Sequence, residues 1–183
     1  VADLVNFDNE ANILLRIVDV VRSHGCNLGV QEDDYVDRDF RSEFSALYSR
    51  VHRTPSELPK RLHFVRIEGR SHNDKPITLA QLKKSNYLGF CVLRPLGIGR
   101  VGRTYIVSPK WPKDNARFTC STPLRGNLGA LRFSTVGCPF IHQDGMVMVC
   151  AQAALWTALH FMHVHYSGPR FLPPEITEAA YRN

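Results

Sequence analysis

The chain has 183 residues, of which 44% are hydrophobic and 22% charged, and a formal net charge of +6. This composition is typical of a soluble globular chain that can bury a core without disulfide bonds, as one domain with at most a small extra lobe. It excludes a membrane span, which needs about 18 uninterrupted apolar residues. It also excludes a secretory signal, because the start VADLVNFDNEANILLRIV carries acids where such a signal carries bases.

Two helices are predicted near the N-terminus, the first over residues 9–24 and the second beginning at about Asp37. The first has aliphatic residues at helical spacing and ends at Gly25, and Asp37 is a good N-cap residue for the second. We expect the acidic stretch QEDDYVD between them to be a loop and TPSELPK to end the second helix.

Beyond residue 60 the pattern changes to short alternating runs that are typical of strands. We predict strands over 62–69, 87–96, 103–109, 117–122 and 129–135, a short helix over 77–85, a long helix after Cys150, and the start of a further helix in PPEITEAAYRN. The pattern predicts an α+β fold, with an N-terminal helical segment (residues 1–60) that leads into an α+β core of antiparallel strands (residues 61–183).

The five cysteines form no C-x-x-C pair, which argues against a zinc knuckle and against a disulfide framework. We therefore expect reduced thiols and a cytoplasmic protein.

Charge is distributed unevenly along the chain. Residues 1–40 hold nine acidic and three basic side chains, whereas residues 41–183 hold eight and twenty. An acidic N-terminal segment can pack against a basic body, and a basic body can bind an anionic protein or nucleic acid. We prefer scattered cations on a solvated sheet face, but a binding surface would use Arg94, Arg100, Arg103, Lys110, Trp111, Lys113, Arg117, Arg125 and Arg132.

Two motifs resemble ligand sites but lack parts that those sites need. GIGRVG (residues 97–102) has the glycine spacing of a dinucleotide-binding loop, but a β-prone run follows it in place of a helix, so we predict a hairpin turn and no cofactor. His160 and His163 lie three residues apart, but no acid lies between them as in a metalloprotease H-E-x-x-H helix. We predict no metal site there, and histidines whose positive charge suits the end of a helix.

The stretch QDGMVMVCAQAALWTALHF (residues 143–161) places Gln143 shortly before Cys150, which begins the predicted long helix. The partial positive charge of a helix N-terminus favours thiolate over thiol and so activates a cysteine. A glutamine amide and the backbone N–H of the cysteine can together form an oxyanion hole. The alternative is that Cys150 is only a small buried apolar residue. We expect the helix to be buried centrally through Ala154, Leu155, Ala158, Leu159, Met162 and Tyr166.

These residues resemble the papain-like cysteine peptidase superfamily, nearest to the bacterial bacteriocin-processing peptidases, where a Gln, a short spacer and a Cys open the central helix. The resemblance implies that Cys150 is the nucleophile and Gln143 the oxyanion-hole donor. It also implies a central helix packed on an antiparallel sheet and hydrolysis or transfer at an amide bond of a peptide or protein substrate. Val149-Cys150-Ala151 departs from the Asp-Cys-Gly that these peptidases often carry.

The sequence leaves the catalytic base open. His160 lies roughly 15 Å along a helix from Cys150, beyond hydrogen-bond reach. The superfamily's His follows the central helix, but residues 167–183 contain none. The base therefore lies in a longer chain beyond Asn183, which makes the papain-like core incomplete, or upstream at His63 or His142. In the third interpretation the domain has lost catalysis and acts as a binding module.

Overall fold

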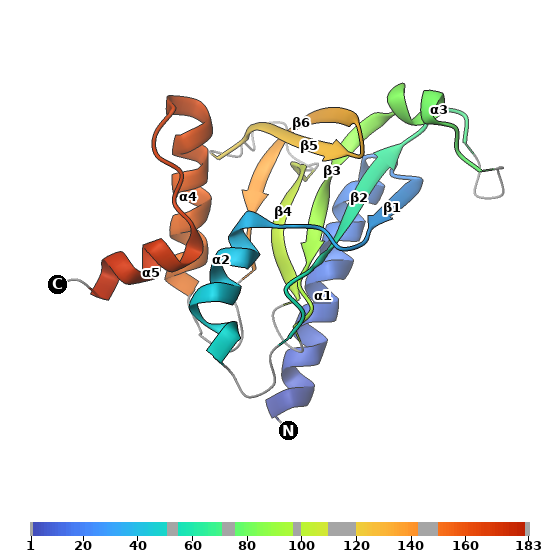
Figure 1. The fold of residues 1–183 in the computed structure, drawn as a ribbon. Helices are drawn as coiled ribbons and strands as arrows, with labels where there is room; N and C mark the ends of the chain where they lie inside the picture. Colours follow the sequence, from blue (N-terminus) through green and yellow to red (C-terminus); the bar gives the residue numbers. More distant parts are fainter. Residues whose placement is uncertain are drawn as a thin grey trace.

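The computed structural model describes residues 2–50, 55–70, 76–96, 100–109, 120–142 and 150–181; for residues 2–12 and Cys150 it describes the backbone alone. Within these ranges the chain has an α+β architecture, as predicted (Figure 1). Its elements are, in chain order, α1 (Ala2–Ser23), β1 (Leu28–Glu32), α2 (Arg38–Ala46), the short 3-10 helix η1 (Tyr48–Arg50), β2 (Lys60–Arg66), α3 (Leu79–Lys83), β3 (Asn86–Leu93), β4 (Val101–Val107), β5 (Thr122–Leu128), β6 (Leu131–Phe140), α4 (Cys150–Tyr166) and α5 (Pro173–Tyr181).

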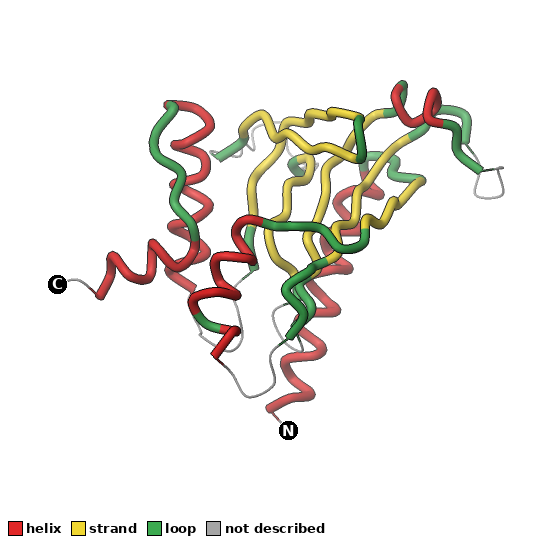
Figure 2. The backbone as a smooth tube through the Cα atoms, viewed as in Figure 1, coloured by secondary structure: helices red, strands yellow, loops and turns green. Residues whose placement is uncertain are grey.

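The strands form a six-stranded sheet in the order β1-β2-β3-β4-β6-β5, and all neighbouring strands are antiparallel. The sheet curls, so that the β5–β6 hairpin folds back over β2 and β3 (Figure 2). Arg61 of β2 accordingly donates a hydrogen bond to the carbonyl oxygen of Asn127 in β5, and the ring of Tyr87 stacks on Phe133 with centroids 4.8 Å apart.

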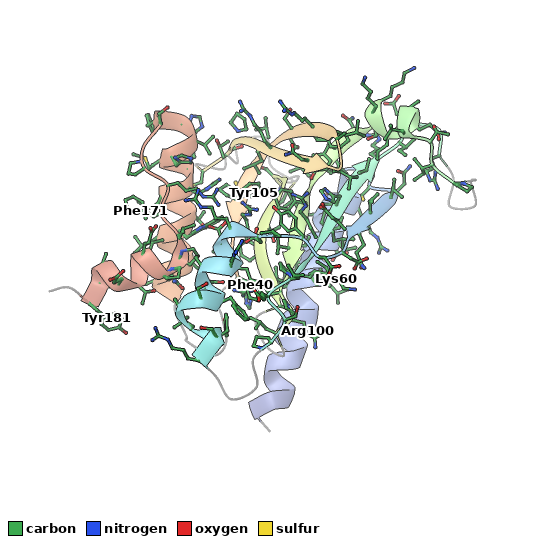
Figure 3. The ribbon with its side chains drawn as sticks, in the orientation of Figure 1. Phe40, Lys60, Arg100, Tyr105, Phe171 and Tyr181 are labelled. Carbon is green, nitrogen blue, oxygen red and sulfur yellow. The ribbon has the colours of Figure 1, made fainter. Side chains whose placement is uncertain are left out.

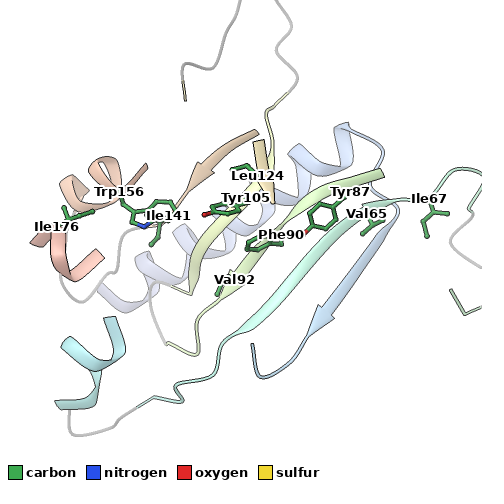
Figure 4. Close-up of a cluster of buried hydrophobic side chains, with 10 residues drawn as sticks. All are labelled: Val65, Ile67, Tyr87, Phe90, Val92, Tyr105, Leu124, Ile141, Trp156 and Ile176. Atoms are coloured by element: carbon green, nitrogen blue, oxygen red, sulfur yellow. The ribbon is translucent and has the colours of Figure 1, made fainter. Parts of the chain in front are cut away.

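Alternation along the strands assigns side chains to the two faces of the sheet. On one face, Phe64 and Cys91 pack with Ile17 and Val21 of α1. On the other face, a larger cluster joins the sheet to α4 and α5 (Figure 4). Its buried members are Val65, Ile67, Tyr87, Phe90, Val92, Tyr105, Leu124, Ile141, Trp156 and Ile176.

Gly89 allows β3 and β4 to approach closely where the sheet curls. Its φ is +124°, and a Cβ at this position would collide with the carbonyl oxygen of Tyr105. The register of β2 with β3 shifts between Phe64 and Val65, beside this position. Glycine is therefore required here both by backbone conformation and by space.

Helix α2 begins where the sequence predicts. Asp37 is its N-cap, and the Asp37 carboxylate accepts a hydrogen bond of 2.9 Å from the backbone N–H of Phe40. Phe40 then packs with Tyr48 and Leu96, which anchors α2 beside the end of β3 (Figure 3).

Two strands differ from the prediction. β1 was not predicted, and the expected loop QEDDYVD overlaps its end, so the helical segment predicted over residues 1–60 also holds a strand, stabilised by pairing with β2. The strand predicted over 117–122 ends where β5 begins, at Thr122; residues 117–119 lie outside the described residues. The strand β5 is difficult to recognise in the sequence because it contains Pro123, Gly126 and Asn127, which favour turns. Pairing with β6 overrides this preference.

Helix α4 does not bury the face that its sequence suggests. Leu155, Met162 and Tyr166 are 51%, 49% and 69% exposed, whereas Trp156 and His160 on an adjoining face are buried. The reason is position: α4 contacts the edge hairpin β5–β6 and α5, so one of its faces meets solvent (Figure 1). Of the predicted apolar set, Leu159 packs against the core.

In the part of the chain that the structure describes, no helix combines the length and apolar character needed to cross a membrane.

Candidate functional site

A pocket lies where the end of β6 meets the first turns of α4. Ile141 and His142 approach it from β6, Gln152 and Ala153 from α4. Glu43 of α2, Trp156 and Pro173 complete its lining, and it holds about 220 Å³ of unfilled space, its open mouth included. Of the two residues predicted to be catalytic, Gln143 lies outside the described residues, and Cys150 is described only as the backbone position where α4 begins.

Gln152 joins α4 to α5 at the floor of this pocket. Its side-chain amide donates hydrogen bonds to the carbonyl oxygen of Pro173 and, over 2.9 Å, to the hydroxyl of Thr177. Because both α-helices contribute to the lining, this link fixes the width of the pocket.

His142 is the titratable group with acid–base chemistry suited to this pocket. It is half-buried, and its buried Nδ1 has no hydrogen-bond partner in the part of the chain that the structure describes. Burial, and then the nearby charge of Arg94, lower the pKa of His142 below its usual value of 6.5. The imidazole is therefore neutral at pH 7 and can accept a proton.

Arg94 and Glu43 form a buried ion pair behind His142. The Nη1 of Arg94 lies 3.1 Å from the Oε2 of Glu43, and the two side chains are 1% and 8% exposed. The Nη2 of Arg94 donates to the carbonyl oxygen of His142 over 3.2 Å. One guanidinium thus connects α2 to the end of β6.

A second charged cluster holds α4 and α5 against α2. The carboxylate of Asp39 accepts hydrogen bonds from Trp156 Nε1 at 3.4 Å and from Arg170 at 2.8 Å, and Arg103 lies 3.5 Å away. Arg103 also pairs with Asp37 over 2.6 Å. The sequence did not single out these partners. Its charge asymmetry left packing of the acidic segment on basic residues open as one of two alternatives, and Asp37 and Asp39 do pair with Arg103 and Arg170.

His63, one of the two upstream candidates for the base, is not among the residues that line the pocket. It is fully buried, and its ring nitrogens lie 2.8 Å from the hydroxyl of Tyr87 and 3.3 Å from Glu32. Burial, then the charge of Arg61, lower the pKa of His63. Both nitrogens are occupied, so His63 acts as a core histidine.

The histidines of α4 also have structural contacts. His160 is buried, stacks on Trp156 with centroids 5.0 Å apart, and lies 2.7 Å through Nε2 from the hydroxyl of Tyr105. Burial lowers the pKa of His160 to about 4, so it is neutral, contrary to the predicted positive charge at this helix end. His163 lies 2.6 Å through Nδ1 from the carbonyl oxygen of Gly168. Among the described residues no group of three or more His, Cys, Asp or Glu side chains could hold a metal ion.

Two of the residues considered for a basic binding surface are buried. Arg94 and Arg103 are 3% and 9% exposed and are paired with acids, so they cannot contact a partner's phosphates. Arg125 and Arg132 are exposed on the β5–β6 hairpin, and residues 110–117 lie outside the described residues. Residues 97–99 of the glycine-rich motif also lie outside the described residues. The strands on either side of the motif, β3 and β4, pair as antiparallel neighbours, as the predicted hairpin requires.

No model of a known protein family, no functionally characterised protein and no solved structure matches the chain. The function of the pocket therefore has to be inferred from its chemistry.

Proposed function

We propose that this chain carries a thiol-dependent active site of papain-like type, which hydrolyses or transfers an amide bond of a peptide or protein substrate. The observation that carries the proposal is that α4 begins at Cys150, one turn before Ala153, which lines the same pocket as His142. The resemblance around Gln143 and Cys150 adds to it, with α4 as the papain-like central helix.

Helix geometry connects Cys150 to the pocket. Residues three apart lie on the same side of an α-helix, and Ala153, one turn after Cys150, lines the pocket. The backbone N–H groups of the first turn have no partner within a helix and supply partial positive charge. This environment favours the thiolate of a cysteine at position 150.

The proposed roles follow from this arrangement. His142 accepts the thiol proton, and the Cys150 thiolate attacks the carbonyl carbon of the substrate to form a tetrahedral oxyanion. Gln143 and the Cys150 N–H stabilise that oxyanion. The amine then leaves with the proton from His142, and water or an acceptor amine releases the resulting thioester.

His142 is preferred to His63 as the base because, of the two, His142 lines the pocket and has a ring nitrogen without a hydrogen-bond partner among the described residues. If His142 variants retain full activity, the base lies elsewhere, as the resemblance implies for a longer chain.

The test is selective alkylation of the folded protein by iodoacetamide, followed by peptide mass spectrometry. Each cysteine is compared with itself in urea, where all five react as unfolded thiols. We expect Cys150 to react faster in the folded protein than in urea at pH 6. Cys91 is fully buried with its pKa raised to about 11, and it should be protected instead. If folding protects Cys150 as much as Cys91, the nucleophile assignment is wrong.

A further inference from the structure

Arg94 lies at the junction of three elements that meet behind the pocket. Besides Glu43 of α2 and the His142 carbonyl after β6, its Nη2 lies within 3.4 Å of the carbonyl oxygen of Val101 in β4. The planar guanidinium has five N–H donors in a fixed arrangement, so it can bond acceptors on several elements at once. A lysine ammonium would keep the charge but not this geometry.

The contact with His142 is to the backbone, and this determines what Arg94 can do. Among the described residues the buried Nδ1 of His142 has no hydrogen-bond partner, so no acid of that part of the chain orients the ring through this atom. The position of the imidazole therefore depends on the backbone that carries it. Arg94 holds that backbone through a donor that is itself buried.

We propose that Arg94 is a positioning residue for the pocket: it holds the backbone at His142 beside the first turn of α4. The catalytic consequence rests on the proposed function, whereas the effect on His142 can be measured without it. The charge of Arg94 also favours neutral imidazole, as a general base requires.

Two variants separate the geometry of Arg94 from its charge. Arg94→Lys keeps the charge and loses the multiple hydrogen bonds. The double variant Glu43→Gln/Arg94→Gln removes both charges of this ion pair together. Arg61→Lys is the matched control, because Arg61 is another buried arginine with 7% of its side chain exposed, and it pairs with Glu32 away from the pocket.

Two readouts are needed: the pKa of His142 by NMR of histidine-labelled protein, assigned with His142→Gln, and the rate of Cys150 alkylation against pH. For Arg94→Lys we expect a low His142 pKa and a ten- to hundredfold slower alkylation, on the order of the loss from a small misplacement. For the double variant we expect the His142 pKa to rise towards 6.5. Arg61→Lys should change neither readout, even if it lowers the melting temperature.

The proposal is overturned if folded Arg94→Lys alkylates Cys150 at the wild-type rate, or if the double variant leaves the His142 pKa unchanged. Where the double variant does not fold, the Arg94→Lys result decides. If wild-type Cys150 shows no enhanced reactivity, the proposed function fails by itself. The His142 resonances in Arg94→Lys then still report whether Arg94 holds this segment, since a shifted chemical environment is expected only if it does.

Discussion

The carboxylate of Asp39 and the guanidinium of Arg170 lie 2.8 Å apart, although 131 residues separate them in the chain. Asp39 lies in the first turn of α2, and Arg170 lies in the turn between α4 and α5, so the pair joins the two sides of the pocket. Trp156 of α4 donates to the same carboxylate. Asp39 is 1% exposed, so these two donors and the charge of Arg103 compensate a carboxylate that water cannot reach.

Replacing Asp39 by Ala should destabilise the protein because it leaves Arg170 without its buried partner. We expect a loss of about 3 kcal/mol, the lower end for breaking a buried pair, since Asp37 still compensates Arg103. Urea unfolding followed by circular dichroism measures this. The control is Asp33→Ala, whose exposed pair with Lys60 should contribute nothing measurable. Equal effects of the two substitutions would contradict the role assigned to Asp39.

The orientation of α4 is tested by two consecutive residues, one buried and one exposed. Trp156→Ala should cost about 3–5 kcal/mol because it empties a buried site and removes the donor to Asp39. Leu155→Ala should cost less than about 1 kcal/mol because Leu155 is 51% exposed. Thermal and urea unfolding measure both losses. A larger loss for Leu155→Ala would mean that the apolar face is covered in solution.

The buried and exposed faces of α4 also show how far the sequence predicts the fold. Hydrophobic periodicity located α1, α2 and α4, because spacing and caps such as Asp37 are local signals. It gave the wrong face of α4, because all sides of that helix carry apolar residues and only the tertiary position decides which is buried. β1 was missed because an edge strand that runs into acids has no clear pattern of its own.

The sequence identifies only those residues of the candidate site that lie close together in the chain. His142 was recognisable as a candidate because it adjoins Gln143 in the sequence. Arg94 and Glu43 were not, because they are far apart in the chain and meet only through the packing of α2 on the sheet. A charge asymmetry predicts that ion pairs form, but it does not identify which residues pair.

Stability should depend on pH through His160. Its pKa is about 4 in the folded protein and 6.5 ordinarily, so between these values the unfolded chain binds a proton that the folded protein does not. The stabilisation present above pH 6.5 is therefore lost as the pH falls towards 4, by about 3 kcal/mol. Urea unfolding at a series of pH values measures the slope.

His160→Gln should reduce that slope, because Gln does not titrate. Tyr105→Phe is the matched variant: it removes the hydrogen bond to His160 at a cost of about 1 kcal/mol but keeps the buried imidazole, so most of the slope should persist. If His160→Gln leaves the slope unchanged, protonation of other groups governs the acid sensitivity.

The last prediction concerns His142 as the base. His142→Gln should slow turnover of a peptide or amide substrate by about a hundredfold or more, the usual contribution of a positioned general base. It should also flatten the pH dependence of Cys150 alkylation below pH 6.5, because the group with the lowered pKa is lost. His165→Gln, an exposed histidine on α4, is the control for overall changes. A His142→Gln protein with wild-type turnover would leave Cys150 as the nucleophile and transfer the role of base to a residue outside this pocket.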